Sequence, residues 1–321
     1  MDYARFVRLR APIWDQFESR LSAAQKEPRR LGHADLESVA LAYRQILHDH
    51  ALAASRFPGT GAARRLGVLA LRGTHWLHWD RGDRVPGPGQ FFARTFPLTF
   101  RAHLPHLAAA VALFATALAF GTCLAIVQPA TGAAILGPHA IEGLREGHLW
   151  TESLVTTIPP VVSSSGIAAN NMSVALAGWA GGAALGLGSL YVILLNGFLL
   201  GAILATTVHY GLLGAMLAFV SAHGPLEITL ILATAAGGLS LGQALVAAED
   251  LPRRLVLRRA SRDALVLLIG CLPWFIVLGV VEAVVSPAPT VPAPMKAALG
   301  LGLEACFLLL AWNPLLPAER R

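Results

Sequence analysis

Residues 221-SAHGPLEITLILATAAGGLSLG-242 form an apolar stretch of membrane-crossing length that begins with polar residues. At a rise of 1.5 Å per residue, about 20 residues span a hydrocarbon core of about 30 Å. His223, Gly224 and Pro225 open the stretch, and Glu227 follows four residues after the histidine. Residues four apart share one face of a helix. The stretch therefore predicts a transmembrane helix over about 226–247 with two titratable side chains at its head.

The whole chain has the composition of a membrane protein with a basic amino-terminal part. It is 55% hydrophobic and 14% charged, with a mean hydropathy of +0.58, whereas soluble domains are about one quarter charged. Residues 1–104 hold 16 of the 25 lysines and arginines. This asymmetry indicates a soluble head joined to a polytopic membrane domain.

The apolar runs predict an all-α membrane bundle of about six spans within residues 106–315. A run at 211–222 is too short to cross the bilayer and predicts a re-entrant or half-buried helix. The six expected spans cover about 106–127, 168–187, 190–209, 226–247, 264–285 and 295–312.

The amino-terminal part predicts a cytoplasmic helical head over residues 1–88. Phe6, Leu9, Ile13, Phe17 and Leu21 recur at spacings of three and four, which is typical of an amphipathic helix. Further helices are expected at about 35–56 and 61–79. Residues 89–105 combine aromatic side chains with arginines, which favours an interfacial amphipathic helix and linker at the lipid headgroups.

Charge placement predicts the orientation of the chain in the membrane. Six crossings place the head, the five-arginine segment 249–263 and the tail 316–321 in the cytoplasm, as the positive-inside rule requires. The pI of 9.8 has the same explanation, because the basic residues lie in segments that flank the membrane. We therefore expect membrane lipids as partners and no nucleic acid. The three cysteines lie in apolar runs without a CxxC motif, so we expect no disulfide, metal or cofactor.

Glycines recur at four-residue spacing in three of the expected spans. Small residues at this spacing let helix backbones approach closely. They predict either tight packing within one chain, which is the favoured interpretation, or the face of a homodimer. The residues are Gly178, Gly182, Gly186, Gly197, Gly201, Gly238 and Gly242.

Polar side chains within apolar runs cost free energy unless they are paired, so they mark candidate sites. Glu282 is expected near a membrane surface, where water solvates it. The candidate intramembrane polar cluster comprises His223, Glu227, Asn196, Asn170, Asn171 and Glu304.

The pair His223 and Glu227 admits three interpretations. With Gly224 and Pro225 as a hinge, the pair satisfies backbone groups at the end of the re-entrant segment, and this is the favoured interpretation. A proton or substrate pathway is the second. A metal site is the third, but two ligands on one helix are too few to assign one.

Two blocks of the sequence resemble the stage II sporulation protein M family of multipass membrane proteins. They are 170-NNMSVALAGWAGGAALGLGSLYVILLNGFLLGAI-203 and the His-Gly-x-x-Glu stretch at 221–242, with weaker matches at Trp14 and 43-YRQ-45. The head segment 66-LGVLALRGTHWLH-78 departs from the family pattern, in which an asparagine and a more polar surface are expected.

The resemblance implies an integral inner-membrane protein without established enzymatic chemistry, and we expect it not to be an enzyme. Its implied partners are cell-wall hydrolases or AAA-type ATPases. We therefore expect a membrane scaffold that assembles envelope-remodelling partners as a homodimer. The alternative is a transporter or channel-like protein whose broken-helix polar site surrounds His223 and Glu227. No nucleophile–base pair supports an enzyme.

Overall fold

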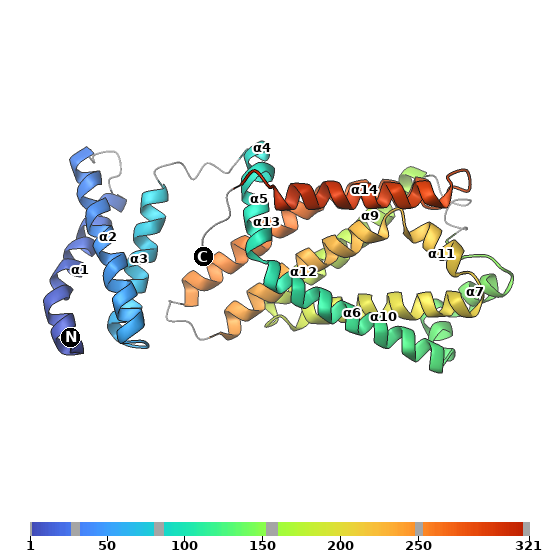
Figure 1. Cartoon of the computed structure of the whole chain (residues 1–321), viewed down its shortest axis with the longest axis horizontal. Helices are drawn as coiled ribbons and strands as arrows, with labels where there is room; N and C mark the ends of the chain where they lie inside the picture. Colours follow the sequence, from blue (N-terminus) through green and yellow to red (C-terminus); the bar gives the residue numbers. More distant parts are fainter. Residues whose placement is uncertain (1, 27–32, 80–86, 152–159, 248–252, 317–321) are drawn as a thin grey trace. The chain divides into compact units, whose positions relative to one another are not determined.

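The computed structural model describes residues 2–26, 33–79, 87–151, 160–247 and 253–316, and these residues form helices and no strands (Figure 1). Contacts between Cα atoms divide the chain into two compact units. One comprises Met1–Gly87 with Ala247–Val256, and the other comprises Pro88–Val246 with Leu257–Arg321.

The first unit contains three helices that pack on one another: α1 (Tyr3–Lys26), α2 (His33–Arg56) and α3 (Gly61–Trp79). Their apolar faces form one core. Its largest members are Phe6, Trp14, Phe17, Leu21, Val39, Ile46, Leu66 and Leu69.

The buried face of α1 differs from the predicted stripe. Leu9 is 55% exposed, whereas Trp14 is 1% exposed. The face that turns inward follows positions 6, 10, 14, 17 and 21, and position 10 is an arginine. Arg10 lies 3.6 Å from the buried carboxylate of Asp49, which also accepts a hydrogen bond from Trp14 Nε1 at 2.9 Å. Because position 10 is charged, the apolar pattern alone did not identify the face of α1 that is buried.

The second unit is a helical membrane bundle, as predicted. Among the described residues, five helices are long and apolar enough to cross a membrane. They are α6 (Leu104–Val127), α10 (Leu187–His209), α12 (Gly224–Val246), Val256–Val285, which covers most of α13 (Arg253–Val280) and all of η4 (Val281–Val285), and α14 (Ala293–Trp312).

The second expected span corresponds to α9 (Pro160–Ala180), followed by the short helix η3 (Gly181–Ala183). It is not among the five candidates, because its serines, asparagines and glycines lower its hydropathy. Before it, α7 (Ala130–Arg145) lies between the first and second expected spans. The six-span count stays a prediction.

The short apolar run after α10 contains α11 (Leu213–Val220), a helix of 8 residues. At 1.5 Å per residue it extends about 12 Å, which is less than half of a hydrocarbon core. It packs on α10 and α14.

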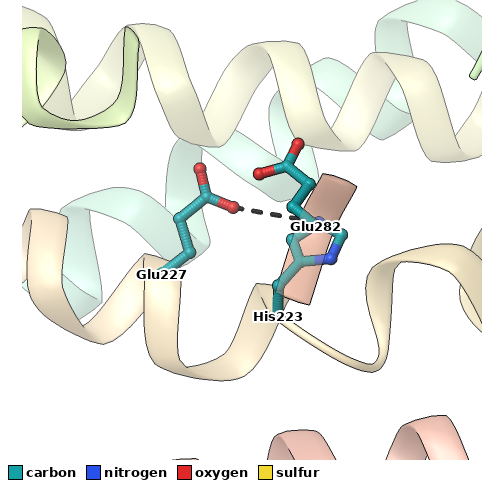
Figure 2. Close-up of side chains that lie close together, drawn as sticks. All are labelled: His223, Glu227 and Glu282. Carbon is teal, nitrogen blue, oxygen red and sulfur yellow. Dashed lines mark ion pairs between the residues drawn. The ribbon is translucent and has the colours of Figure 1, made fainter. Parts of the chain in front are cut away.

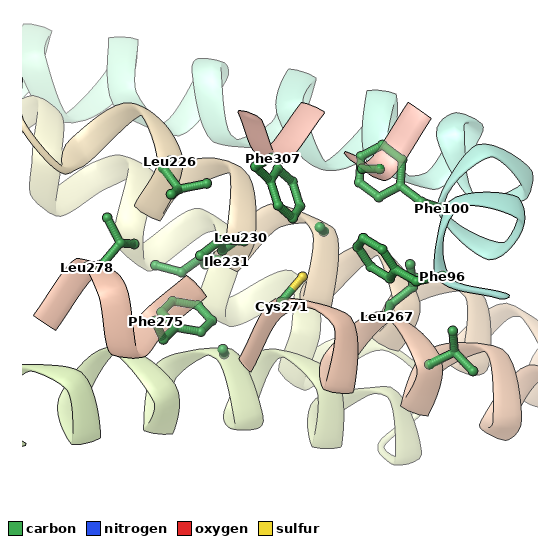
Figure 3. Packing of buried hydrophobic residues seen from close by; sticks show 14 of the residues in the cluster. Phe96, Phe100, Leu226, Leu230, Ile231, Leu267, Cys271, Phe275, Leu278 and Phe307 are labelled. Atoms are coloured by element: carbon green, nitrogen blue, oxygen red, sulfur yellow. The ribbon is translucent and has the colours of Figure 1, made fainter. Parts of the chain in front are cut away.

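The segment predicted to lie at the headgroups packs two of its aromatic rings into the bundle core, and its position relative to the membrane stays a prediction. It comprises α4 (Pro88–Gln90), η2 (Phe91–Thr95) and α5 (Phe96–Ala102). Phe96 and Phe100 are 0% and 5% exposed and contact Phe307 of α14 (Figure 3). These ring contacts join α5 to α14 within the bundle.

The predicted glycine faces bring helices of the same chain into backbone contact. A Cβ atom at Gly182 would collide with the backbone of Gly238, and one at Gly242 would collide with Gly186. On the other side of α10, Gly197 and Gly201 lie against backbone carbonyl groups of α6. The described contacts of these glycines thus support the predicted packing within one chain.

Candidate functional site

The site begins at the corner between α11 and α12. The backbone N–H of Glu227 donates to the carbonyl oxygen of His223 at 3.0 Å, so the two side chains share one helical face. Gly224 and Pro225, the predicted hinge, lie in this corner. A Cβ atom at Gly224 would collide with the side chain of Val220 on α11, so glycine permits the close approach of the two helices.

His223 is held in one orientation by a residue at the end of η4. Its side chain is 5% exposed. Its Nδ1 atom lies 2.8 Å from the hydroxyl of Ser286, and its ring packs edge-on against Phe219. Lys296 of α14 donates to the carbonyl oxygen of Ser286 at 2.6 Å. The ring nitrogen Nε2 is left to face Glu227, with Oε2 at 4.0 Å.

A second carboxyl group completes the site. The ligand atoms of His223, Glu227 and Glu282 all lie within 4.8 Å of one another. Figure 2 shows that the two carboxyl groups and the imidazole ring turn toward the same space. We call these three residues the His–Glu–Glu cluster. One nitrogen and two oxygen donors at this spacing can bind a divalent cation.

The asparagines of α9 support the cluster from a third side. Asn171 is 5% exposed and donates through Nδ2 to Glu282 Oε2 at 3.2 Å. Asn170 donates in turn to the side-chain oxygen of Asn171 at 3.3 Å. The predicted residues His223, Glu227, Asn170 and Asn171 are therefore brought together.

Local backbone geometry explains why Glu282 and Ser286 both reach the site. They belong to η4 and its carboxyl-terminal cap, where the backbone forms a π-helix with the Ser286 N–H donating to the Val281 carbonyl. A π-helical turn holds one residue more than an α-helical turn and is frequent at functional sites.

A family model described as Stage II sporulation protein M matches residues 110–287, more than half of the chain. The chain belongs to this family. A second model, described as a domain of unknown function (DUF8413), matches residues 4–78. No curated protein and no solved structure matches the chain.

The stage II sporulation protein M match contains the whole His–Glu–Glu cluster together with Asn171 and Ser286, whereas Lys296 and Glu304 lie beyond it. Asn196 and Glu304, two other predicted residues, do not join the cluster. Asn196 donates to the carbonyl of Val192 on its own helix at 2.8 Å, and Glu304 accepts a hydrogen bond from Thr229 at 2.9 Å.

The site, which comprises the cluster and its hydrogen-bonded neighbours, contains three residues that sequence reasoning misplaced or missed: Glu282, Ser286 and Lys296. Glu282 was expected in water, yet it is half-buried and hydrogen-bonded to Asn171. Topology could have predicted the position of Glu282. The end of one span and the start of its antiparallel neighbour lie on the same side of a membrane bundle, so the end of η4 is expected near the start of α12. Lys296 lies in an apolar run, and its partner is a backbone carbonyl that no sequence pattern identifies.

Proposed function

We propose that this stage II sporulation protein M family member is a non-enzymatic membrane scaffold that assembles partners for envelope remodelling. The observation that carries the proposal is that its intramembrane polar residues make separate hydrogen bonds and do not form one connected group. Asn196 and Glu304 are bonded locally, and His223 is buried against Ser286. Among the described residues, Glu304 and His223 each bond to a residue of another helix, Asn196 bonds within its own helix, and none of the three bonds to another of them.

Close backbone packing supports the same role. At Gly182–Gly238 and at Gly201, neighbouring helices touch without intervening side chains. Interfaces of this kind resist sliding, because any displacement brings backbone atoms into collision. A rigid frame suits a protein that holds partners in position.

The head unit offers a surface for such partners. It has its own core, and its outer surface carries the exposed apolar residues Leu41 and Leu47, which are 58% and 41% exposed. Arg65 of α3 pairs with Asp15 and Glu18 of α1, and the hydrogen bonds that it donates to these carboxylates raise the pKa of the Arg65 guanidinium. Exposed apolar side chains on a surface that also carries charged residues are suited to reversible protein contacts. The partners proposed from family resemblance are cell-wall hydrolases or AAA-type ATPases.

Crosslinking in the native host tests the scaffold proposal. A photo-reactive amino acid replaces Leu41 or Leu47 on α2, and Arg8, an exposed position on α1, serves as the matched control. We expect one discrete crosslinked partner from the α2 positions and none from Arg8. Equal, diffuse labelling from all three positions would contradict a specific docking face.

We also propose a bacterial inner-membrane location, cytoplasmic termini and a homodimer. The basic head and the arginine-rich segment 249–263 support the orientation through the positive-inside rule. The apolar residues Phe120 and Tyr191, which are 62% and 64% exposed, are available to lipid or to a second copy. Cysteine-accessibility labelling at the termini and mass photometry in nanodiscs test the two assignments. Labelling of the termini from outside the cell, or a monomer alone, would contradict them.

Transport is the second candidate function, and the observation that favours it is partial exposure of Glu227. Its side chain is 22% exposed beside the buried His223. Proteoliposomes containing the full chain distinguish the two functions. Ion or proton flux that is lost in Glu227→Gln would favour transport, whereas vesicles as tight as protein-free vesicles would favour the scaffold.

A further inference from the structure

The geometry points to a binding site for one divalent transition-metal ion, formed by His223 Nε2 and the carboxylates of Glu227 and Glu282. The site lies where the start of α12 meets the end of η4. It is independent of the scaffold proposal, because metal binding and partner assembly are measured separately.

The spacing of the three donor groups is close to that of a metal site. Zinc binds imidazole nitrogen and carboxylate oxygen at about 2.0–2.2 Å, which separates tetrahedral ligands by about 3.4 Å. The three ligand atoms here lie within 4.8 Å of one another, and His223 Nε2 and Glu227 Oε2 are 4.0 Å apart. Side-chain rotations that move the ligand atoms by roughly 1 Å would bring them to the distances of a zinc site.

The supporting hydrogen bonds are those that metal ligands require. A histidine ligand usually donates its other ring N–H to a fixed acceptor, which sets the tautomer and aims the free nitrogen at the metal. Ser286 Oγ lies 2.8 Å from Nδ1 and can accept that N–H, which leaves the Nε2 lone pair facing the carboxylates. Lys296 fixes the Ser286 backbone, and Asn171 holds Glu282.

The burial of the histidine is a second, independent observation. Its side chain is 5% exposed, and Nε2 is directed toward two acidic groups that come from different helices. A cation between the two carboxyl groups lowers their mutual repulsion in surroundings of low polarity. The Glu227 side chain is 22% exposed, which leaves an approach for the ion.

The donor set indicates the class of metal. Calcium and magnesium prefer an all-oxygen shell, whereas an imidazole with two carboxylates suits zinc, manganese or ferrous iron. Three protein ligands leave at least one coordination position for water or for another ligand. We commit to zinc as the probe ion, with cobalt as its spectroscopic substitute.

Zinc titration of the full chain tests the site. Tag-free protein in nanodiscs is stripped with a chelator, and zinc binding is followed by competition with a fluorescent chelator and by elemental analysis after desalting. We expect one zinc ion per chain, and loss of that ion in Glu227→Gln and Glu282→Gln, which preserve side-chain shape. Asn171→Ala should weaken affinity by about 10–100-fold, as supporting residues of metal sites do.

A carboxylate outside the cluster provides the matched control. Glu304→Gln alters a half-buried glutamate of α14 that bonds to Thr229, and it should leave zinc stoichiometry and affinity unchanged. Cobalt-loaded protein should show visible absorption bands that are absent in Glu282→Gln. The proposal is overturned if the wild-type chain retains no stoichiometric zinc, or if Glu282→Gln binds as the wild type does.

Discussion

The Nδ1 atom of His223 lies 2.8 Å from the Oγ atom of Ser286, which joins the start of α12 to the end of η4. Both residues are buried. The bond therefore attaches the turn between α11 and α12 to the end of η4. The polar head of an otherwise apolar helix is thus part of the tertiary structure of the bundle.

Removing the Ser286 hydroxyl should destabilise the membrane bundle. In Ser286→Ala, His223 Nδ1 loses its hydrogen-bond partner within a buried site, which costs about 1–3 kcal/mol. The expected result is a lower melting temperature in thermal unfolding followed by tryptophan fluorescence. Ser173→Ala is the control, because Ser173 is exposed and bonds only to its own helix at Asn170. Equal melting temperatures for the two variants would contradict the role of the bond.

A methyl group at Gly238 should also destabilise the bundle. Gly238→Ala places a carbon atom against the Gly178 carbonyl oxygen and the Ser189 hydroxyl, and overpacking of this kind costs about 1–3 kcal/mol. Gly302→Ala on α14 is the matched control, because a Cβ atom there meets nothing within 4 Å. We expect the control to melt at or above the wild-type temperature. The packing account fails if both alanine variants behave alike.

The buried carboxylate of the head should be important for its stability. Asp49→Ala removes the acceptor of the Trp14 N–H and the partner of Arg10, and an unsatisfied buried donor costs about 1–3 kcal/mol. Faster hydrogen exchange of α1 and α2 amides in the full chain is the expected readout. Asp15→Ala, which removes only an exposed pair with Arg65, should cost less than about 1 kcal/mol. Unchanged exchange in Asp49→Ala would refute the prediction.

The aromatic segment before α6 should behave as core. Phe96 is fully buried, so Phe96→Ala should lower the free energy of unfolding by about 3–5 kcal/mol. Phe92, which is half-buried four residues earlier, is the control and should cost less. If both substitutions are equally mild, the segment lies at the interface as the sequence alone suggested.

Sequence patterns anticipated the helices well, because long apolar runs have few alternatives in a membrane. The run at 226–247 corresponds to α12, and the short run at 211–222 corresponds to α11. The glycine spacing likewise predicted close helix contact. In these cases the signal is local, since hydropathy and small-residue spacing act along one helix.

The parts that sequence reasoning missed depend on pairings between distant segments. From the sequence, Glu282 is expected to be a solvated residue at the end of a span, whereas in the structure Asn171 of α9 donates a hydrogen bond to it. Phe96 reads as interfacial until Phe307 of α14 is known to be its neighbour. Trp14 was not placed on the buried face of α1, because that face also carries Arg10, whose partner Asp49 lies on another helix. A single-sequence pattern contains no information on such partners.

The π-helical turn at Val281–Val285 makes this end of the bundle sensitive to the number of residues as well as to their identity. Each residue of a helix turns the chain by about 100°. Deleting one residue between Glu282 and Ser286 would remove the extra residue of the π-helical turn and displace the Ser286 hydroxyl, which bonds to His223, relative to the Glu282 carboxylate. A single-residue deletion here should therefore be more damaging than most substitutions, and relatives that keep the arrangement should keep the spacing of four between these two positions.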